Sequence, residues 1–105
     1  KISYCQWLND DGKLEADLTV CKLAEDRFLV VCTDTMHRHV ETWLKRHGED
    51  AHMFVNDVTG GYCQLNVQGP KSRELLQEIT SEDLSHENFP FRTAREIDIG
   101  YARAL

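Results

Sequence analysis

Asp17 is the residue whose type and position point most directly to chemistry. It stands between Ala16 and Leu18, in the middle of an extended pattern from Leu14 to Val20. Strand interiors are poor in Asp, because its side chain competes with the backbone for hydrogen bonds and packs poorly. Two interpretations stay open from residue types alone. Asp17 either faces water on a half-exposed strand or serves as a functional acid.

The segment before Asp17 predicts the element that positions it. Tyr4 to Leu8 carries strand-favouring residues, and Asn9-Asp10-Asp11-Gly12 is a strong turn signal. The stretch from Tyr4 to Val20 is therefore predicted to be a strand, a turn and a second strand.

The rest of the chain alternates between extended and helical patterns. A connection at Cys21–Asp26 leads into a continuous apolar strand, Arg27–Cys32. Capping residues at Thr33-Asp34-Thr35 precede an amphipathic helix from Met36 to His47, which Gly48 ends. The later predicted elements are strands at His52–Val55, Tyr62–Val67 and Ala94–Ile99, and a second helix with Pro70 at its first position and Leu75, Leu76 and Ile79 on its core face.

This element order predicts an α+β fold, an antiparallel sheet with flanking helices, because hairpin-length connections join its strands. A chain of 105 residues is enough for one modest core. Its 41% hydrophobic and 29% charged residues are typical of a globular domain. A net charge of −6 without a basic stripe argues against nucleic-acid partners. No apolar run approaches the roughly 20 residues that a membrane span needs, so no membrane partner is expected.

The cysteines and histidines favour structural roles. The four cysteines (Cys5, Cys21, Cys32 and Cys63) form no Cys-x-x-Cys pair, and each stands in an expected strand among apolar neighbours. They are interpreted as buried free thiols. His39 and His47 share a helical stripe with Trp43, but two histidines eight residues apart cannot chelate one ion, so no metal site is predicted.

A series of motifs spans nearly the whole chain. Its members are Tyr4, Leu8-Asn9, Gly12, Asp17-Leu18-Thr19-Val20, Phe28-Leu29-Val30-Val31, Gln68-Gly69-Pro70, Thr80–Ser85 and Phe89-Pro90-Phe91. This series resembles the folate-binding domain shared by the glycine cleavage T-protein (aminomethyltransferase) and the C-terminal parts of sarcosine and dimethylglycine dehydrogenases. The sequence Glu15-Ala16-Asp17 is more similar to the dehydrogenases of this family than to the T-proteins.

The resemblance implies a site for tetrahydrofolate. It makes Asp17 the catalytic acid beside the folate nitrogen that accepts a one-carbon unit, and adds Tyr4, Thr19 and Thr33 as folate-binding residues. The chemistry is sound, since a carboxylate in a partly desolvated pocket can accept a hydrogen bond from a nitrogen and raise its nucleophilicity. T-proteins usually carry an Asn near the position of Thr33. A hydroxyl there cannot offer the paired donor and acceptor of an amide.

Residues 1–105 are interpreted as a fragment of one aminomethyltransferase-type domain, whose fold the rest of its polypeptide completes. The resemblance implies a dehydrogenase that binds FAD in a domain outside this fragment and oxidises a small N-methyl amine. Such enzymes are expected in the mitochondrial matrix of eukaryotes and the cytoplasm of bacteria. Two alternatives stay open: the glycine cleavage aminomethyltransferase, and a non-catalytic protein like the pyruvate dehydrogenase phosphatase regulatory subunit.

Overall fold

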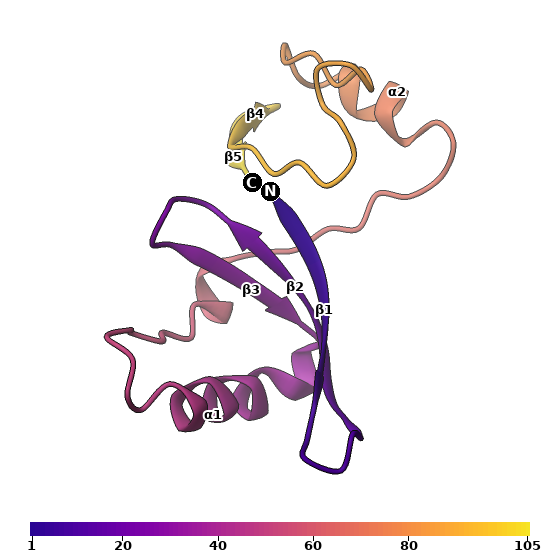
Figure 1. The fold of residues 1–105 in the computed structure, drawn as a ribbon. Helices are drawn as coiled ribbons and strands as arrows, with labels where there is room; N and C mark the ends of the chain where they lie inside the picture. Colours follow the sequence, from indigo (N-terminus) through magenta and orange to yellow (C-terminus); the bar gives the residue numbers. More distant parts are fainter.

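A computed structural model describes residues 1–105 and shows an α+β chain, as predicted. Its best-packed part is residues 1–47, named here the N-terminal unit. There, three antiparallel strands form a sheet in the order β1-β2-β3, with β1 at Ile2–Leu8, β2 at Leu14–Lys22 and β3 at Phe28–Cys32. Figure 1 shows this sheet with α1 lying across its lower part.

The β1–β2 turn forms as its residue types predict. The side-chain oxygen of Asn9 accepts hydrogen bonds from the backbone N–H groups of Asp11 (3.1 Å) and Lys13 (2.9 Å). Gly12 adopts a φ of +75°, which an L side chain rarely tolerates. The register shifts between Trp7 and Leu8, next to this turn. The hairpin therefore takes its shape from local hydrogen bonds.

One face of the sheet is covered by a helix. A short 3-10 turn, η1 (Asp34–Met36), leads into α1 (His37–His47), which starts one residue later than predicted. Val40 of α1 packs on Ala16 and Leu18 of β2, and all three are buried. The surrounding half-buried side chains are Cys5, Trp7, Val20, Val30, Cys32, Met36 and Leu44. The core of the molecule lies here, between β2 and α1.

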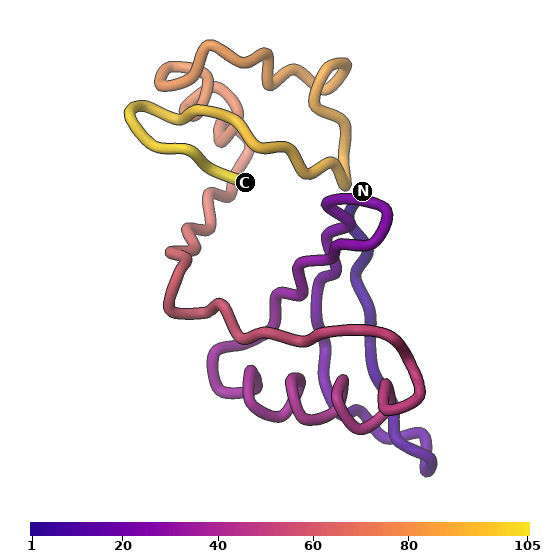
Figure 2. Tube along the Cα trace, turned by 90° about the vertical axis from the view of Figure 1, so that its left-hand side faces the viewer, coloured from indigo at the N-terminus to yellow at the C-terminus, as the bar shows by residue number.

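The remaining residues 48–105, named here the C-terminal stretch, contain few regular elements. They are a second 3-10 turn, η2 (Thr59–Gly61), a short helix, α2 (Ser72–Gln77), and a two-stranded hairpin of β4 (Ile97–Ile99) and β5 (Ala102–Ala104). In Figure 2 the chain after η2 runs apart from the sheet before reaching α2. A single backbone bond, from the Ile2 amide to the Arg92 carbonyl (2.9 Å), ties β1 to this stretch beyond η2.

Two predicted strands are wrong. Neither His52–Val55 nor Tyr62–Val67 belongs to a strand. A strand is completed by hydrogen bonds to a neighbour, and no neighbour lies beside these residues. The alternating pattern of Tyr62–Val67 is real, but both of its faces are exposed.

The prediction for the second helix was wrong in two respects. Pro70 precedes the N-cap residue Lys71, so it lies outside the helix. The expected core face is also open, because Leu75 is 63% exposed and Ile79, just past the helix, is 49% exposed. The strand predicted at Ala94–Ile99 forms only over its last three residues, as β4.

The chain as a whole is extended. Its radius of gyration is 16.1 Å, whereas a compact chain of this length has about 13 Å. Its accessible surface is 8782 Å², compared with roughly 6,000 Å² for a compact protein of the same mass. Only six of 105 residues are buried. The described residues therefore enclose a small core and leave much apolar surface in water.

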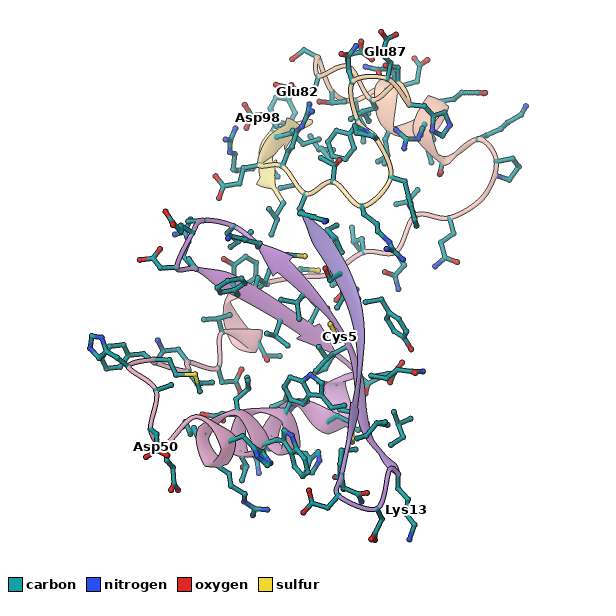
Figure 3. All side chains as sticks on the ribbon, viewed as in Figure 1. Cys5, Lys13, Asp50, Glu82, Glu87 and Asp98 are labelled. Carbon is teal, nitrogen blue, oxygen red and sulfur yellow. The ribbon has the colours of Figure 1, made fainter.

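All four thiols are free, and three are shielded as predicted. Cys21 is buried, whereas Cys5 and Cys32 are half-buried. Figure 3 shows Cys5 on β1 and Lys13 at the tip of the hairpin. The prediction was wrong for Cys63, which is exposed because the strand expected around it has no neighbour.

Candidate functional site

The candidate site lies on the face of the sheet opposite α1. Side chains alternate between the two faces of a strand, so Tyr4, Asp17 and Thr19 point away from the core residues Cys5, Ala16 and Leu18. The resemblance assigned each of these three residues separately. The antiparallel register brings them together on one open surface.

Tyr4 and Asp17 are in direct contact. The phenol of Tyr4 donates a hydrogen bond to Oδ2 of Asp17 at 3.3 Å. The two residues are diagonal neighbours, because Tyr4 pairs with Thr19 and Gln6 pairs with Asp17. Diagonal pairs on one face of a sheet lie within reach of a long side chain. A phenol that donates to one carboxylate oxygen leaves the other free to accept a bond from a ligand.

Thr19 lies within β2 and Thr33 follows β3, and the two residues differ in their exposure. Thr19 is half-buried in the middle strand, opposite Tyr4 on one side and Val31 on the other. Thr33 is exposed one residue beyond β3, with an extended backbone (φ −63°, ψ 143°). The last β2–β3 pair is Leu18–Cys32, so the register carried one step further brings Thr33 alongside Asp17. The structure thus brings Tyr4, Asp17 and Thr19 together, and Thr33 follows directly after the β3 residue that pairs with Leu18.

The sequence analysis expects Asp17 to lie in a partly desolvated pocket, but residues 1–105 do not enclose it. Asp17 is exposed, and Tyr4 is 57% exposed. The surface around them is a flat sheet face with a carboxylate acceptor, a phenol and two hydroxyls. This donor and acceptor set fits one face and one edge of a flat, nitrogen-rich ring such as the pterin of tetrahydrofolate. Tyr4 would pack against the ring while Asp17 accepts from its N–H groups.

Gln6 is a neighbour of the site that sequence reasoning missed. It is the direct cross-strand partner of Asp17 and is exposed on the same face. The alternation of β1 could have found it, since Tyr4 and Gln6 are two residues apart. Its amide could both donate to and accept from a ligand bound at Asp17.

A second cluster stands where β3 meets α1. His37 Nδ1 lies 2.5 Å from the carbonyl oxygen of Asp34, and its Nε2 lies 3.9 Å from Oδ2 of Asp57. The pKa of Asp57 is lowered, mainly by hydrogen bonds from Thr59 and to a smaller extent by the charges of His37 and Arg38. This cluster holds the segment after α1 against the end of β3.

The same surroundings raise the pKa of the Cys32 thiol. Burial is the main cause that raises its pKa above the ordinary value of 9.0, and the charges of Asp57 and Asp34 add to it. Because the thiolate is the nucleophile, a raised pKa suppresses thiol chemistry. The surroundings of Cys32 therefore favour its neutral thiol over the thiolate.

An open groove lies elsewhere, between β1 and α1. Its volume is about 570 Å³, and it is lined by Gln6, Trp7, Leu8, Trp43, Leu44, His47, Gly48, Ala51 and Met53. Most of its lining is apolar, and Asp17 is absent from it. The groove shares Gln6 with the surface around Asp17, but Tyr4, Asp17, Thr19 and Thr33 do not line it, so it is not the candidate folate site.

Other polar side chains form no centre. The histidine stripe of α1 is a stacked surface, with Trp43 4.6 Å from His47 and 5.7 Å from His39 between ring centres. His39 Nε2 also lies 3.0 Å from Oε2 of Glu15 on β2. No group of three or more His, Cys, Asp or Glu side chains is arranged to hold a metal ion. In Figure 3, Glu82 and Glu87 spread over the outside of the C-terminal stretch.

No helix of the structure combines the length and the apolar character needed to cross a bilayer.

Sequence comparison defines the class of this domain. A family described as the GCVT N-terminal domain matches residues 1–105. The chain therefore belongs to the aminomethyltransferase (glycine cleavage T-protein) family of folate-binding domains, as its motifs predicted.

Two curated relatives refine the comparison. The chain is 38% identical over 107 residues to 4-methylaminobutanoate oxidase (formaldehyde-forming) of Paenarthrobacter nicotinovorans, covering 100% of this chain and 13% of that protein. It is 27% identical over 105 residues to the mitochondrial pyruvate dehydrogenase phosphatase regulatory subunit of Mus musculus, covering 99% of this chain and 12% of that protein. The chain thus spans a small part of the length of each relative.

Proposed function

We propose that residues 1–105 are the tetrahydrofolate-binding part of an FAD-dependent enzyme of the sarcosine and dimethylglycine dehydrogenase type. The enzyme passes a one-carbon unit from a small N-methyl amine to folate. The observation that carries the proposal is the Tyr4–Asp17 hydrogen bond on an open sheet face of a folate-domain family member. The 38% identical relative adds support, because its name describes an oxidase of an N-methyl amine that forms formaldehyde.

The residues of this chain have distinct roles in the proposal. The Asp17 carboxylate accepts a hydrogen bond from a ring N–H of the folate, which increases the electron density at that nitrogen. The Tyr4 phenol holds the carboxylate in place through its own bond to Oδ2. Thr19, Thr33 and Gln6 offer hydroxyl and amide groups to the ring edge. Bound tetrahydrofolate supplies the nitrogen that takes up the one-carbon unit.

The proposal places the other components outside residues 1–105. The chain has no Gly-x-Gly-x-x-Gly sequence, so FAD and the amine are expected to bind in another domain of the same polypeptide. Further chain also completes the fold and encloses Asp17. The enzyme belongs in the mitochondrial matrix if the source is eukaryotic and in the cytoplasm if it is bacterial.

Calorimetric titration of the full-length polypeptide with tetrahydrofolate tests the site. An Asp17→Ala variant should bind at least about tenfold more weakly, which corresponds to about 1.4 kcal/mol. Glu25→Ala is the matched control, since it removes an exposed carboxylate from the β2–β3 turn and should leave the affinity unchanged. Saturable binding that is equal in all three proteins would remove Asp17 from the site.

The comparison with the phosphatase regulatory subunit favours a second candidate, a non-catalytic protein that acts through protein contacts. In that case the family fold is kept and the folate site is lost. Absence of any tetrahydrofolate binding by the intact, folded polypeptide would select this candidate. The glycine cleavage aminomethyltransferase is a third possibility, and a polypeptide that binds folate but carries no flavin would favour it.

A further inference from the structure

The pairing between β1 and β2 leaves one residue without a partner. Leu8 pairs with Leu14 beside the turn, whereas Trp7, the residue before Leu8, pairs with Ala16. Glu15 therefore stands between two paired positions and is the extra residue of a β-bulge. A bulge bends its strand and changes the direction in which side chains point.

This bulge decides which face of the sheet Asp17 occupies. A shift of one residue in the pairing of a strand moves its side chains to the other face. If the pairing of Leu8 with Leu14 continued along the strands without the extra residue, Asp17 would pair with Cys5. The side chain of Cys5 packs against the core under α1. With the extra residue in place, Asp17 pairs with Gln6 and lies on the open face.

The side chain of Glu15 is held from two directions. Its Oε1 accepts a hydrogen bond from Nδ2 of Asn9 at 3.0 Å, and its Oε2 lies 3.0 Å from Nε2 of His39 on α1. The ring of His39 in turn lies against Trp43, with 5.7 Å between ring centres. The Glu15 side chain is only 22% exposed. One carboxylate thus connects the bulge to the turn and to the helix.

Asn9 links this contact to the geometry of the turn. Its Oδ1 accepts hydrogen bonds from the backbone amides of Asp11 and Lys13, while its Nδ2 donates to Glu15. The turn sets the pairing of the strands at one end, and the bulge changes it by one residue. The Asn9 side chain therefore joins the two features that together determine the position of Asp17.

We propose that Glu15 and His39 form a positioning clamp for Asp17, which holds the bulge and so presents the Asp17 carboxylate on the folate-binding face. This inference deepens the proposed function and rests on it. Neither residue touches folate in the proposal, because Glu15 is turned to α1, which covers the opposite face. Functional side chains must be held to within about 0.5 Å by the residues behind them. A loosened bulge should therefore weaken folate binding in a protein that stays folded.

Calorimetric titration of the full-length polypeptide with tetrahydrofolate tests the clamp, at a temperature where every variant is folded. Glu15→Ala removes both contacts and should weaken binding at least about fivefold. Glu15→Gln should restore the affinity to within about twofold, because its amide can accept from Asn9 and donate to His39. Glu41→Ala is the matched control, since it removes a carboxylate of α1 that pairs with Lys45, and should leave the affinity unchanged.

A double substitution separates positioning from a direct contact. Two residues that act through one group have effects that are not additive. Glu15→Ala should therefore cause no further loss of affinity when it is added to Asp17→Ala. An additive loss would overturn the proposal, and so would an unchanged affinity of the single Glu15→Ala variant.

Hydrogen–deuterium exchange of the same full-length proteins without folate examines the bulge by itself. The amides of residues 5–8 and 14–17 should exchange at least about fivefold faster in Glu15→Ala than in Glu15→Gln. Equal exchange in the two variants would overturn the clamp, whether or not folate binds. An Asp17→Ala variant with full affinity would instead remove the proposed function, so the two failures are distinguished.

Discussion

The N-terminal unit and the C-terminal stretch both contain apolar side chains, but the two regions differ in how well these side chains are buried. In the N-terminal unit, β2 has a strand on each side and α1 over one face, and four of the six buried residues lie there. In the C-terminal stretch, Leu65 and Leu75 are 83% and 63% exposed. The comparison teaches that a hydrophobic pattern stabilises a fold only where another element covers it.

The largest expected effect is on the stability of residues 1–105 when they are produced without any further chain, because the apolar side chains of the C-terminal stretch are then exposed. The isolated chain should be insoluble or molten, because its small core cannot supply the about 5–15 kcal/mol of a stable domain. Differential scanning calorimetry and near-ultraviolet circular dichroism are the measurements. A sharp cooperative melt would show that the C-terminal stretch is stable despite its exposure.

Leu18→Ala should have the largest effect of a single change. Leu18 is 2% exposed between β2 and α1, so its truncation should cost about 2–5 kcal/mol of the free energy of unfolding. Urea denaturation of the full-length polypeptide is the measurement. Leu14→Ala, on the same strand but 59% exposed, is the matched control and should cost less than about 1 kcal/mol.

The cysteines allow the two regions to be compared in one experiment on the full-length polypeptide. Cys63 of the C-terminal stretch should react with iodoacetamide at least about tenfold faster than Cys32, which is half-buried and whose pKa is raised by burial and by Asp57 and Asp34. Peptide mass spectrometry after timed alkylation measures both rates. Equal rates would mean that Cys63 is covered in the full-length polypeptide.

Tyr4→Phe examines the pair on the open face of the N-terminal unit. It removes the hydroxyl that bonds to Asp17 and keeps the ring. An exposed hydrogen bond contributes little, so the tetrahydrofolate affinity of the full-length polypeptide should fall about two- to fivefold. A loss as large as that of Asp17→Ala would give the phenol a direct contact with folate.

The smallest effect concerns acid stability in the C-terminal stretch. Hydrogen bonds from the backbone and side chain of Ser85, and from Asn88, lower the pKa of Asp83 below 3.8. A lowered folded-state pKa stabilises the fold above the unfolded-state value, and this stabilisation is lost as pH falls through the folded-state value. Asp83→Asn should therefore lower the melting temperature of the full-length polypeptide slightly at about pH 6 and leave it unchanged at about pH 2. A pH-independent difference would contradict this origin.

Local structure was well predicted from the sequence. The Asn9–Gly12 turn and the helix ending at His47 depend on hydrogen bonds and spacings within a few residues, so local patterns suffice. Tyr62–Val67 was predicted wrongly because strand formation depends on a neighbour that the local sequence does not contain. The exposure of Leu75 and Ile79 has the same cause. An amphipathic pattern predicts which side of a helix is apolar, but it does not show which element packs against that side.

The candidate site was predicted residue by residue, but its assembly was not. The resemblance pointed to Tyr4, Asp17, Thr19 and Thr33 without giving their contacts. The Tyr4–Asp17 bond depends on which residues of β1 and β2 are opposite each other, and the register shift beside the turn affects this pairing. The alternation of β1 places Gln6 on the same face as Tyr4, but its position opposite Asp17 depends on the register.

The bond between Ile2 and Arg92 has a mechanical consequence. Arg92 adopts a φ of +62°, a backbone conformation that glycine tolerates best, and its carbonyl holds the first residue of β1. Beyond η2, no other backbone bond connects the C-terminal stretch to β1, β2, β3 or α1. Arg92→Gly would therefore relieve the strained backbone conformation and keep the carbonyl that accepts the bond from Ile2, so the connection between the two regions does not depend on the Arg92 side chain.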